Sequence, residues 1–196
     1  WPELVWKDSL HVSLPGKNAF FNQRRGQATV QEIIMDALRY RSQVLVIGSG
    51  LAGCSAALTL ADKGMEVHLL VPTEQLDGGN SQMAQGGIVF SSDPADQKSL
   101  EQDMLVAGHN YNYDTAVHFL ASHGGEAVQK LLMDQLHVPF DRNASGSWDM
   151  TLEGGHAVPR IIHCADYTGK TIIEYLHRAV GCHPHIKILA RRSAVD

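Results

Sequence analysis

The chain has 196 residues, of which 44% are hydrophobic and 19% charged, and its formal net charge is -5 at pH 7. This is the composition of a globular protein of one domain or slightly more. A small negative charge without long runs of one sign argues against binding to nucleic acid or to an anionic membrane surface. No stretch approaches the roughly 20 apolar residues that a membrane-spanning helix needs, so we expect a protein without a membrane partner.

Residues 1–42 form a region of different character from the rest and are interpreted as an N-terminal extension. Apolar residues recur at helical spacing near its end, at Val30, Ile33, Ile34, Ala37 and Leu38. This spacing predicts one amphipathic helix, whose apolar stripe would pack against the main domain or a partner.

From residue 43 the pattern becomes strand, glycine turn, helix and strand. The apolar runs 44–47 and 67–71 flank a helical segment at 52–63, which predicts a βαβ unit. Later segments continue the alternation, with helices expected at 98–107, 113–122, 126–136 and 171–180 and strands at 161–162 and 186–189. The fold class is therefore predicted to be α/β and Rossmann-like, with residues 43–196 as one domain.

The turn after the first strand reads VIGSGLAG over residues 46–53. Its glycines stand at the three positions of the dinucleotide-binding fingerprint, directly after a strand and before a helix. We expect this turn to bind a pyrophosphate through Gly48, Ser49, Gly50, Leu51, Ala52 and Gly53. The alternative is that the glycines serve close packing only. The acid that usually binds a ribose is absent from positions 70–73 and Glu74 lies beyond them, which weakens an NAD-dehydrogenase interpretation.

Three cysteines, Cys54, Cys164 and Cys182, are widely spaced and form no CxxC pattern. Neither a disulfide scaffold nor a metal site is predicted from them, and a reducing cytoplasm fits best.

Two further segments carry specific patterns. Residues 77–88 read DGGNSQMAQGGI, and residues 151–169 contain Thr-Leu-Glu-Gly-Gly-His, then Arg-Ile-Ile-His, then Asp-Tyr-Thr-Gly. With the fingerprint, these blocks occur in the order typical of FAD-dependent flavoproteins of the L-aspartate oxidase and fumarate reductase family, which the chain resembles from about residue 42 to its last residue. The resemblance identifies residues 43–196 as the N-terminal part of an FAD-binding domain.

The resemblance implies that residues 80–87 lie against the flavin and its ribityl chain. The residues carried over are Asn80, Ser81, Ala84, Gln85, Gly86 and Gly87. In membrane-complex members of the family a histidine attached covalently to FAD aligns with Asn80. Asparagine cannot form that bond, so non-covalent FAD is expected. Thr168 and Gly169 resemble the capped beginning of a helix near the flavin.

Glu153 is the catalytic residue that the resemblance implies, as a carboxylate beside the substrate that interacts with its amine or helps to move a proton. The alternative is a solvated glutamate in a turn. His156 and His163 are expected to be structural. Leu152 stands where the family usually has arginine, and Pro159 replaces another basic residue. Both changes remove positive charge that a dicarboxylate site could use.

The implied activity is oxidation of L-aspartate to iminoaspartate on the route to quinolinate and NAD, with O2 or fumarate as electron acceptor. Family members continue into further domains, so the isolated chain is expected to be inactive, with the rest of the site supplied by a C-terminal half or a partner chain. Two alternatives remain: a soluble flavoprotein of the fumarate reductase or succinate dehydrogenase type, and a catalytically silent interaction module.

Overall fold

The computed structural model describes residues 40–76 and 79–194. The helix predicted at the end of residues 1–42 lies outside these ranges. In the part of the chain that the structure describes, every helix is too short or too polar to span a bilayer.

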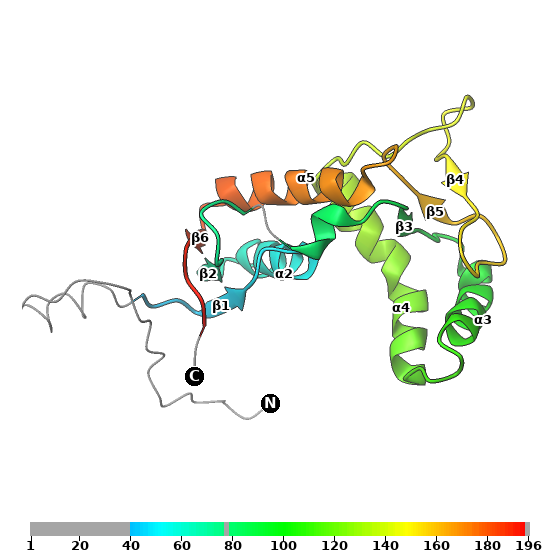
Figure 1. Ribbon diagram of the computed structural model, residues 1–196, viewed down its shortest axis with the longest axis horizontal. Coiled ribbons are helices and arrows are strands. Elements are labelled where there is room, and N and C mark those ends of the chain that lie inside the picture. Colours follow the sequence, from blue (N-terminus) through cyan, green and yellow to red (C-terminus); the bar gives the residue numbers. More distant parts are fainter. Residues whose placement is uncertain (1–39, 77–78, 195–196) are drawn as a thin grey trace, which may run out of the picture.

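A three-stranded parallel sheet forms the first part of the fold (Figure 1). Strand β1 (Val44–Ile47) pairs with β2 (Val67–Leu70), and β6 (Ile186–Leu189) pairs with the other edge of β2. Helix α2 (Leu51–Ala61) connects β1 to β2, which confirms the predicted βαβ unit. Helix α5 (Thr168–Cys182) precedes β6 and packs against α2.

A second, smaller sheet is antiparallel and was not predicted as such. Its strands are β3 (Ile88–Val89), β5 (Ile161–Ile162) and β4 (Met150–Thr151), in the order β3-β5-β4. Only β5 was expected from the sequence. Two-residue strands are too short to show an alternating pattern, so β3 and β4 are defined only by their pairing with β5.

Helix α3 (Gln97–Ala107), which follows the short helix η2 (Pro94–Asp96), packs beside α4 (Asp114–Ala127), and the pair extends away from the parallel sheet (Figure 1). The prediction of two separate helices at 113–122 and 126–136 was wrong. Helix α4 continues directly into a π-helical segment, η3 (Val128–Gln135). Gly125, inside α4, is required by packing, because a Cβ at this position would lie 1.8 Å from the carbonyl oxygen of Ser91.

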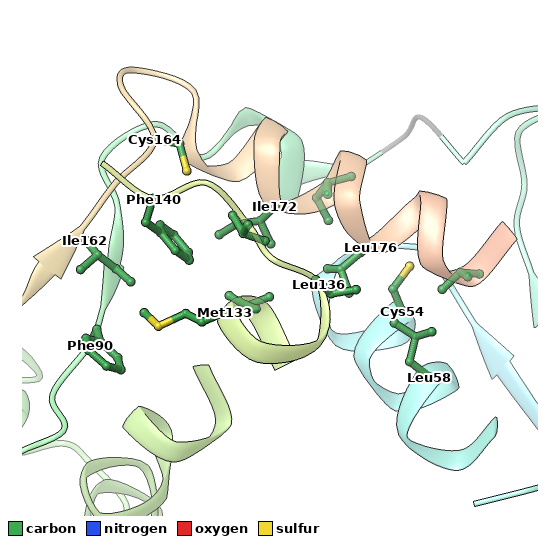
Figure 2. Packing of buried hydrophobic residues seen from close by; sticks show 14 of the residues in the cluster. Cys54, Leu58, Phe90, Met133, Leu136, Phe140, Ile162, Cys164, Ile172 and Leu176 are labelled. Carbon is green, nitrogen blue, oxygen red and sulfur yellow. The ribbon is translucent and has the colours of Figure 1, made fainter. Parts of the chain in front are cut away.

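One hydrophobic core joins the two sheets. It takes residues from α2, η3, β5 and α5 and from the loops between them, as Figure 2 shows. Its members include Cys54, Leu58, Leu69, Phe90, Leu132, Met133, Leu136, Phe140, Ile162, Ile172 and Leu176. The parallel sheet and the segments around β5 therefore share one hydrophobic core.

The substitution Leu176→Ala should lower the free energy of unfolding by about 3 kcal/mol, because Leu176 on α5 is 0% exposed and its truncation loses apolar burial and leaves a cavity. Leu120→Ala is the matched control, since Leu120 is 55% exposed on α4 and should cost less than about 0.5 kcal/mol. Urea denaturation of both variants measures the difference. Equal losses would contradict the placement of Leu176 in the core.

Candidate functional site

The turn between β1 and α2 is shaped by two of its glycines. Gly48 has a φ of +102°, a conformation that side chains disfavour, and its N–H donates to the carbonyl oxygen of Leu70 at 2.9 Å. A Cβ on Gly53 would lie 2.0 Å from the Gly48 carbonyl oxygen. The first turn of α2 therefore packs directly on the end of β1, which only glycine at position 53 allows.

This turn presents unpaired backbone donors. Within residues 40–76 and 79–194, the N–H groups of Ser49, Gly50, Ala52 and Gly53 have no hydrogen-bond acceptor. They lie at the N-terminus of α2, where the helix dipole also favours negative charge. Such a donor set fits a pyrophosphate, the group that joins the two halves of FAD.

The segment around the short helix η1 (Asn80–Met83) contacts this turn directly. The N–H of Leu51 donates to Ser81 Oγ at 3.2 Å, which links the two segments predicted to bind one cofactor. From the other side, the Gly169 N–H at the start of α5 donates to the Ala84 carbonyl at 2.9 Å. The structure therefore brings together three segments that are far apart in the sequence.

The other residues predicted to contact the flavin are exposed, so a ligand can reach them. Asn80, Ala84, Gln85, Gly86 and Gly87 all have exposed surface, and Gly87 packs its backbone against β5.

The start of α5 differs from the capped helix expected. Thr168 is the first helical residue rather than the cap, and the N-cap residue Tyr167 makes no side-chain hydrogen bond. Thr168 Oγ1 instead donates to the Gly86 carbonyl at 3.3 Å and accepts from the Cys164 N–H at 3.0 Å. The hydroxyl fixes the position of the 84–87 segment, a tertiary role that local sequence could not indicate.

Glu153 lies beside this segment. A Cβ on Gly86 would be 2.9 Å from Glu153 Oε2, and Thr151 Oγ1 donates to Glu153 Oε1 at 3.4 Å. The Glu153 side chain is exposed, as is that of Leu152, so the carboxylate faces open space next to the proposed flavin segment. The predicted catalytic residue therefore lies next to Gly86, one of the residues predicted to contact the flavin.

The loop that carries Glu153 is anchored by a buried arginine. Arg160, 1% exposed, donates to both carboxylate oxygens of Asp96 at 2.8 and 2.7 Å and also to Asp103. Asp103 in turn accepts the Ala157 N–H at 2.8 Å, and His156 Nδ1 accepts from Arg160 at 3.0 Å. Both ends of the 156–160 stretch are therefore bound to η2 and α3.

The ion pairs of Arg160 shift the pKa values of the groups that form them. Hydrogen bonding from Arg160 lowers the pKa of Asp96 below its ordinary value, and the Ala157 N–H, together with Arg160, lowers the pKa of Asp103. The two carboxylates in turn raise the pKa of Arg160. The sequence did not reveal this cluster, because acids 57 and 64 positions before an arginine show no recognisable spacing.

Two other residues singled out in the sequence have structural partners. His163 Nδ1 lies 2.9 Å from Asp141 Oδ2, and the same carboxylate oxygen accepts the Ala165 N–H at 2.7 Å. Glu74, beyond β2, forms an exposed ion pair with Arg191, which follows β6. Within the described residues, no group of histidine, cysteine, aspartate and glutamate could hold a metal ion.

The chain is similar to a known protein family over most of its length. The profile of the FAD binding domain family matches residues 43–196, and the chain belongs to this family. The cofactor is therefore FAD, and the resemblance seen in the sequence motifs is confirmed.

Among curated relatives, the chain is 40% identical over 165 residues to L-aspartate oxidase of Pseudomonas aeruginosa, an alignment that covers 80% of the chain and 30% of the relative. It is 36% identical over 155 residues to L-aspartate oxidase of Halobacterium salinarum, covering 79% of the chain and 30% of the relative. The chain thus spans about 30% of the length of these relatives.

Solved structures support the fold. Mycobacterium smegmatis Sdh1 superposes with a TM-score of 0.71 at 21% identity, covering 79% of this chain and 28% of that one. E. coli quinol fumarate reductase gives a TM-score of 0.70 at 19% identity, covering 78% and 26%. These similarities show a mixed α/β fold of the FAD-binding kind.

Replacing Arg160 with methionine should destabilise the protein by about 3 kcal/mol, because Asp96 and Asp103 would lose the cation that pairs them. Both carboxyl groups have lowered pKa values in the folded protein, so the wild-type chain should lose stability as the pH falls below about 4. The substitution Arg160→Met should weaken this pH dependence, because it removes a cause of the lowered pKa values. Urea midpoints at several pH values measure both effects.

Lys130→Met is the control, because Lys130 pairs with Glu126 on an exposed helix face and should cost less than about 1 kcal/mol. An unchanged pH dependence in Arg160→Met would show that other carboxylates cause the acid transition.

Proposed function

We propose that the chain is the FAD-binding part of an enzyme that oxidises L-aspartate to iminoaspartate, toward quinolinate and NAD. The observation that carries the proposal is the position of Glu153, whose carboxylate lies against Gly86 in the segment that resembles the flavin-binding block of L-aspartate oxidases. The 40% identity to the Pseudomonas aeruginosa enzyme supports the choice of substrate class.

In this proposal residues 43–196 hold FAD and residues 1–42 are an extension. The turn Gly48–Gly53 binds the pyrophosphate through the free N–H groups of Ser49, Gly50, Ala52 and Gly53, and residues 80–87 lie along the flavin. Asn80 cannot attach to FAD, so the cofactor is bound without a covalent link. The three free cysteines, two of them buried, agree with a reducing cytoplasmic location.

When bound, FAD would supply the two-electron oxidant for the α-carbon of the substrate. Glu153 can accept a hydrogen bond from the substrate amine, orient it, and receive a proton that the amine loses as the imine forms. The Arg160 cluster keeps the loop of Glu153 fixed through Ala157 and His156, so that the carboxylate does not need to be ordered when substrate binds.

The carboxylates of L-aspartate need cationic partners. The neighbouring side chain at position 152 is leucine, 57% exposed. We propose that a C-terminal half or partner chain supplies these groups, and that O2 or fumarate then reoxidises the flavin. Exposed Leu152 also favours a second candidate, a catalytically silent FAD-domain module that this apolar side chain helps to attach to a partner.

The purified chain loaded with FAD should show a flavin absorption band that passes to the supernatant after acid precipitation. A band retained in the precipitate would mean covalent attachment and contradict the role of Asn80. No band after incubation with excess FAD would favour the silent module.

The substitution Glu153→Gln should slow anaerobic flavin reduction by L-aspartate about 100-fold, the typical contribution of a positioned proton acceptor. Flavin bleaching is followed with the FAD-loaded chain alone and mixed with the C-terminal part of the Pseudomonas aeruginosa relative. Glu126→Gln is the matched control, since Glu126 is exposed on α4, where it pairs with Lys130.

An unaffected rate in Glu153→Gln would remove Glu153 from the reaction. A flavin that L-aspartate does not reduce, but that fumarate reoxidises after chemical reduction, would identify the fumarate reductase type instead.

A further inference from the structure

The carbonyl group of Ser49, in the middle of the glycine turn, is held by two side chains. His177 Nε2 on α5 lies 2.9 Å from the Ser49 oxygen, and Cys54 Sγ on α2 lies 3.2 Å from it. Because the oxygen is only an acceptor, the imidazole nitrogen that contacts it must carry the proton and donate. Ser49 itself is buried, so water does not readily replace these donors.

The orientation of this carbonyl fixes the next N–H group. The peptide bond between Ser49 and Gly50 is planar and trans, so its C=O and N–H point in opposite directions. With the Ser49 oxygen turned inward toward α5, the Gly50 N–H is turned outward at the N-terminus of α2. That N–H has no acceptor among the described residues, so it is available to donate to a phosphate.

The two donors are unequal. A thiol is a weak hydrogen-bond donor, and burial raises the pKa of Cys54 to about 11, so that it stays a thiol at neutral pH. The imidazole N–H makes a shorter and stronger contact, and it comes from a helix 128 positions away in the sequence. His177 is therefore the group that links the orientation of the turn to the packing of α5.

We propose that His177 is a positioning residue for FAD: by holding the Ser49 carbonyl it keeps the Gly50 N–H directed at the pyrophosphate. The proposal rests on the cofactor site described above. In this role His177 acts through the Ser49–Gly50 peptide. Its loss would allow the Ser49–Gly50 peptide to rotate and withdraw one donor from the phosphate, while the hydrophobic packing of α5 remains.

The test compares two substitutions at this position by FAD titration, followed through the quenching of flavin fluorescence. His177→Leu removes the donor and should raise the FAD dissociation constant about fivefold to tenfold, the factor expected for one hydrogen bond. His177→Gln places an amide N–H at nearly the reach of Nε2 and should restore affinity to within about twofold. His123→Leu, on exposed α4, is the control and should leave affinity unchanged.

A second probe separates positioning from general damage to the fold. ADP contains the diphosphate and adenosine does not, so His177→Leu should weaken ADP binding by the same factor as FAD binding and leave adenosine binding unchanged. Titrations are run well below the unfolding temperature of each apo variant, which thermal melting reports independently.

Several results would overturn the proposal: wild-type FAD affinity in His177→Leu, equal weakening by leucine and glutamine, or equal weakening of ADP and adenosine. A wild-type chain that binds neither FAD nor ADP would instead contradict the cofactor site, and the positioning role with it.

Discussion

Helix α5 holds the two parts of the cofactor site in place. Its first residues, Thr168 and Gly169, bind the carbonyls of Gly86 and Ala84, and His177, two turns later, binds the Ser49 carbonyl. Between these contacts the helix is packed into the core through Leu176 and its neighbours. Hydrophobic burial thus stabilises the position of α5, and the polar groups at the edge of the core fix the arrangement of the backbone amides.

The region around Glu153 is stabilised by a different interaction. Arg160 is a buried cation surrounded by acceptors from Asp96, Asp103, Ser99 and His156, and the desolvation of such a group is tolerated only when its donors are satisfied. The result is a rigid support at the base of a loop whose tip is exposed. A carboxylate such as Glu153 can then remain open to ligand while its backbone is constrained.

Much of the chain could be interpreted from sequence because the signals were local. The glycine turn lies between an apolar strand and a helix, and the structure confirms both elements, as it confirms the strands at 161–162 and 186–189. The cofactor followed from three ordered motifs and is confirmed by the family assignment. The catalytic role of Glu153 and the flavin contacts of residues 80–87 remain predictions, although the structure places the Glu153 carboxylate beside Gly86.

Amino-acid sequence by itself determined the βαβ unit and the chemistry of its turn, because the hydrophobic period, the glycine spacing and the helix beginnings are properties of neighbouring residues. Tertiary structure alone decided the role of Gly125 inside a continuous helix, the pairing of β3 and β4, the Arg160 cluster and the contact of His177 with Ser49. Each of these joins groups distant in the chain, and the energy of such contacts depends on packing and burial, which no local pattern records.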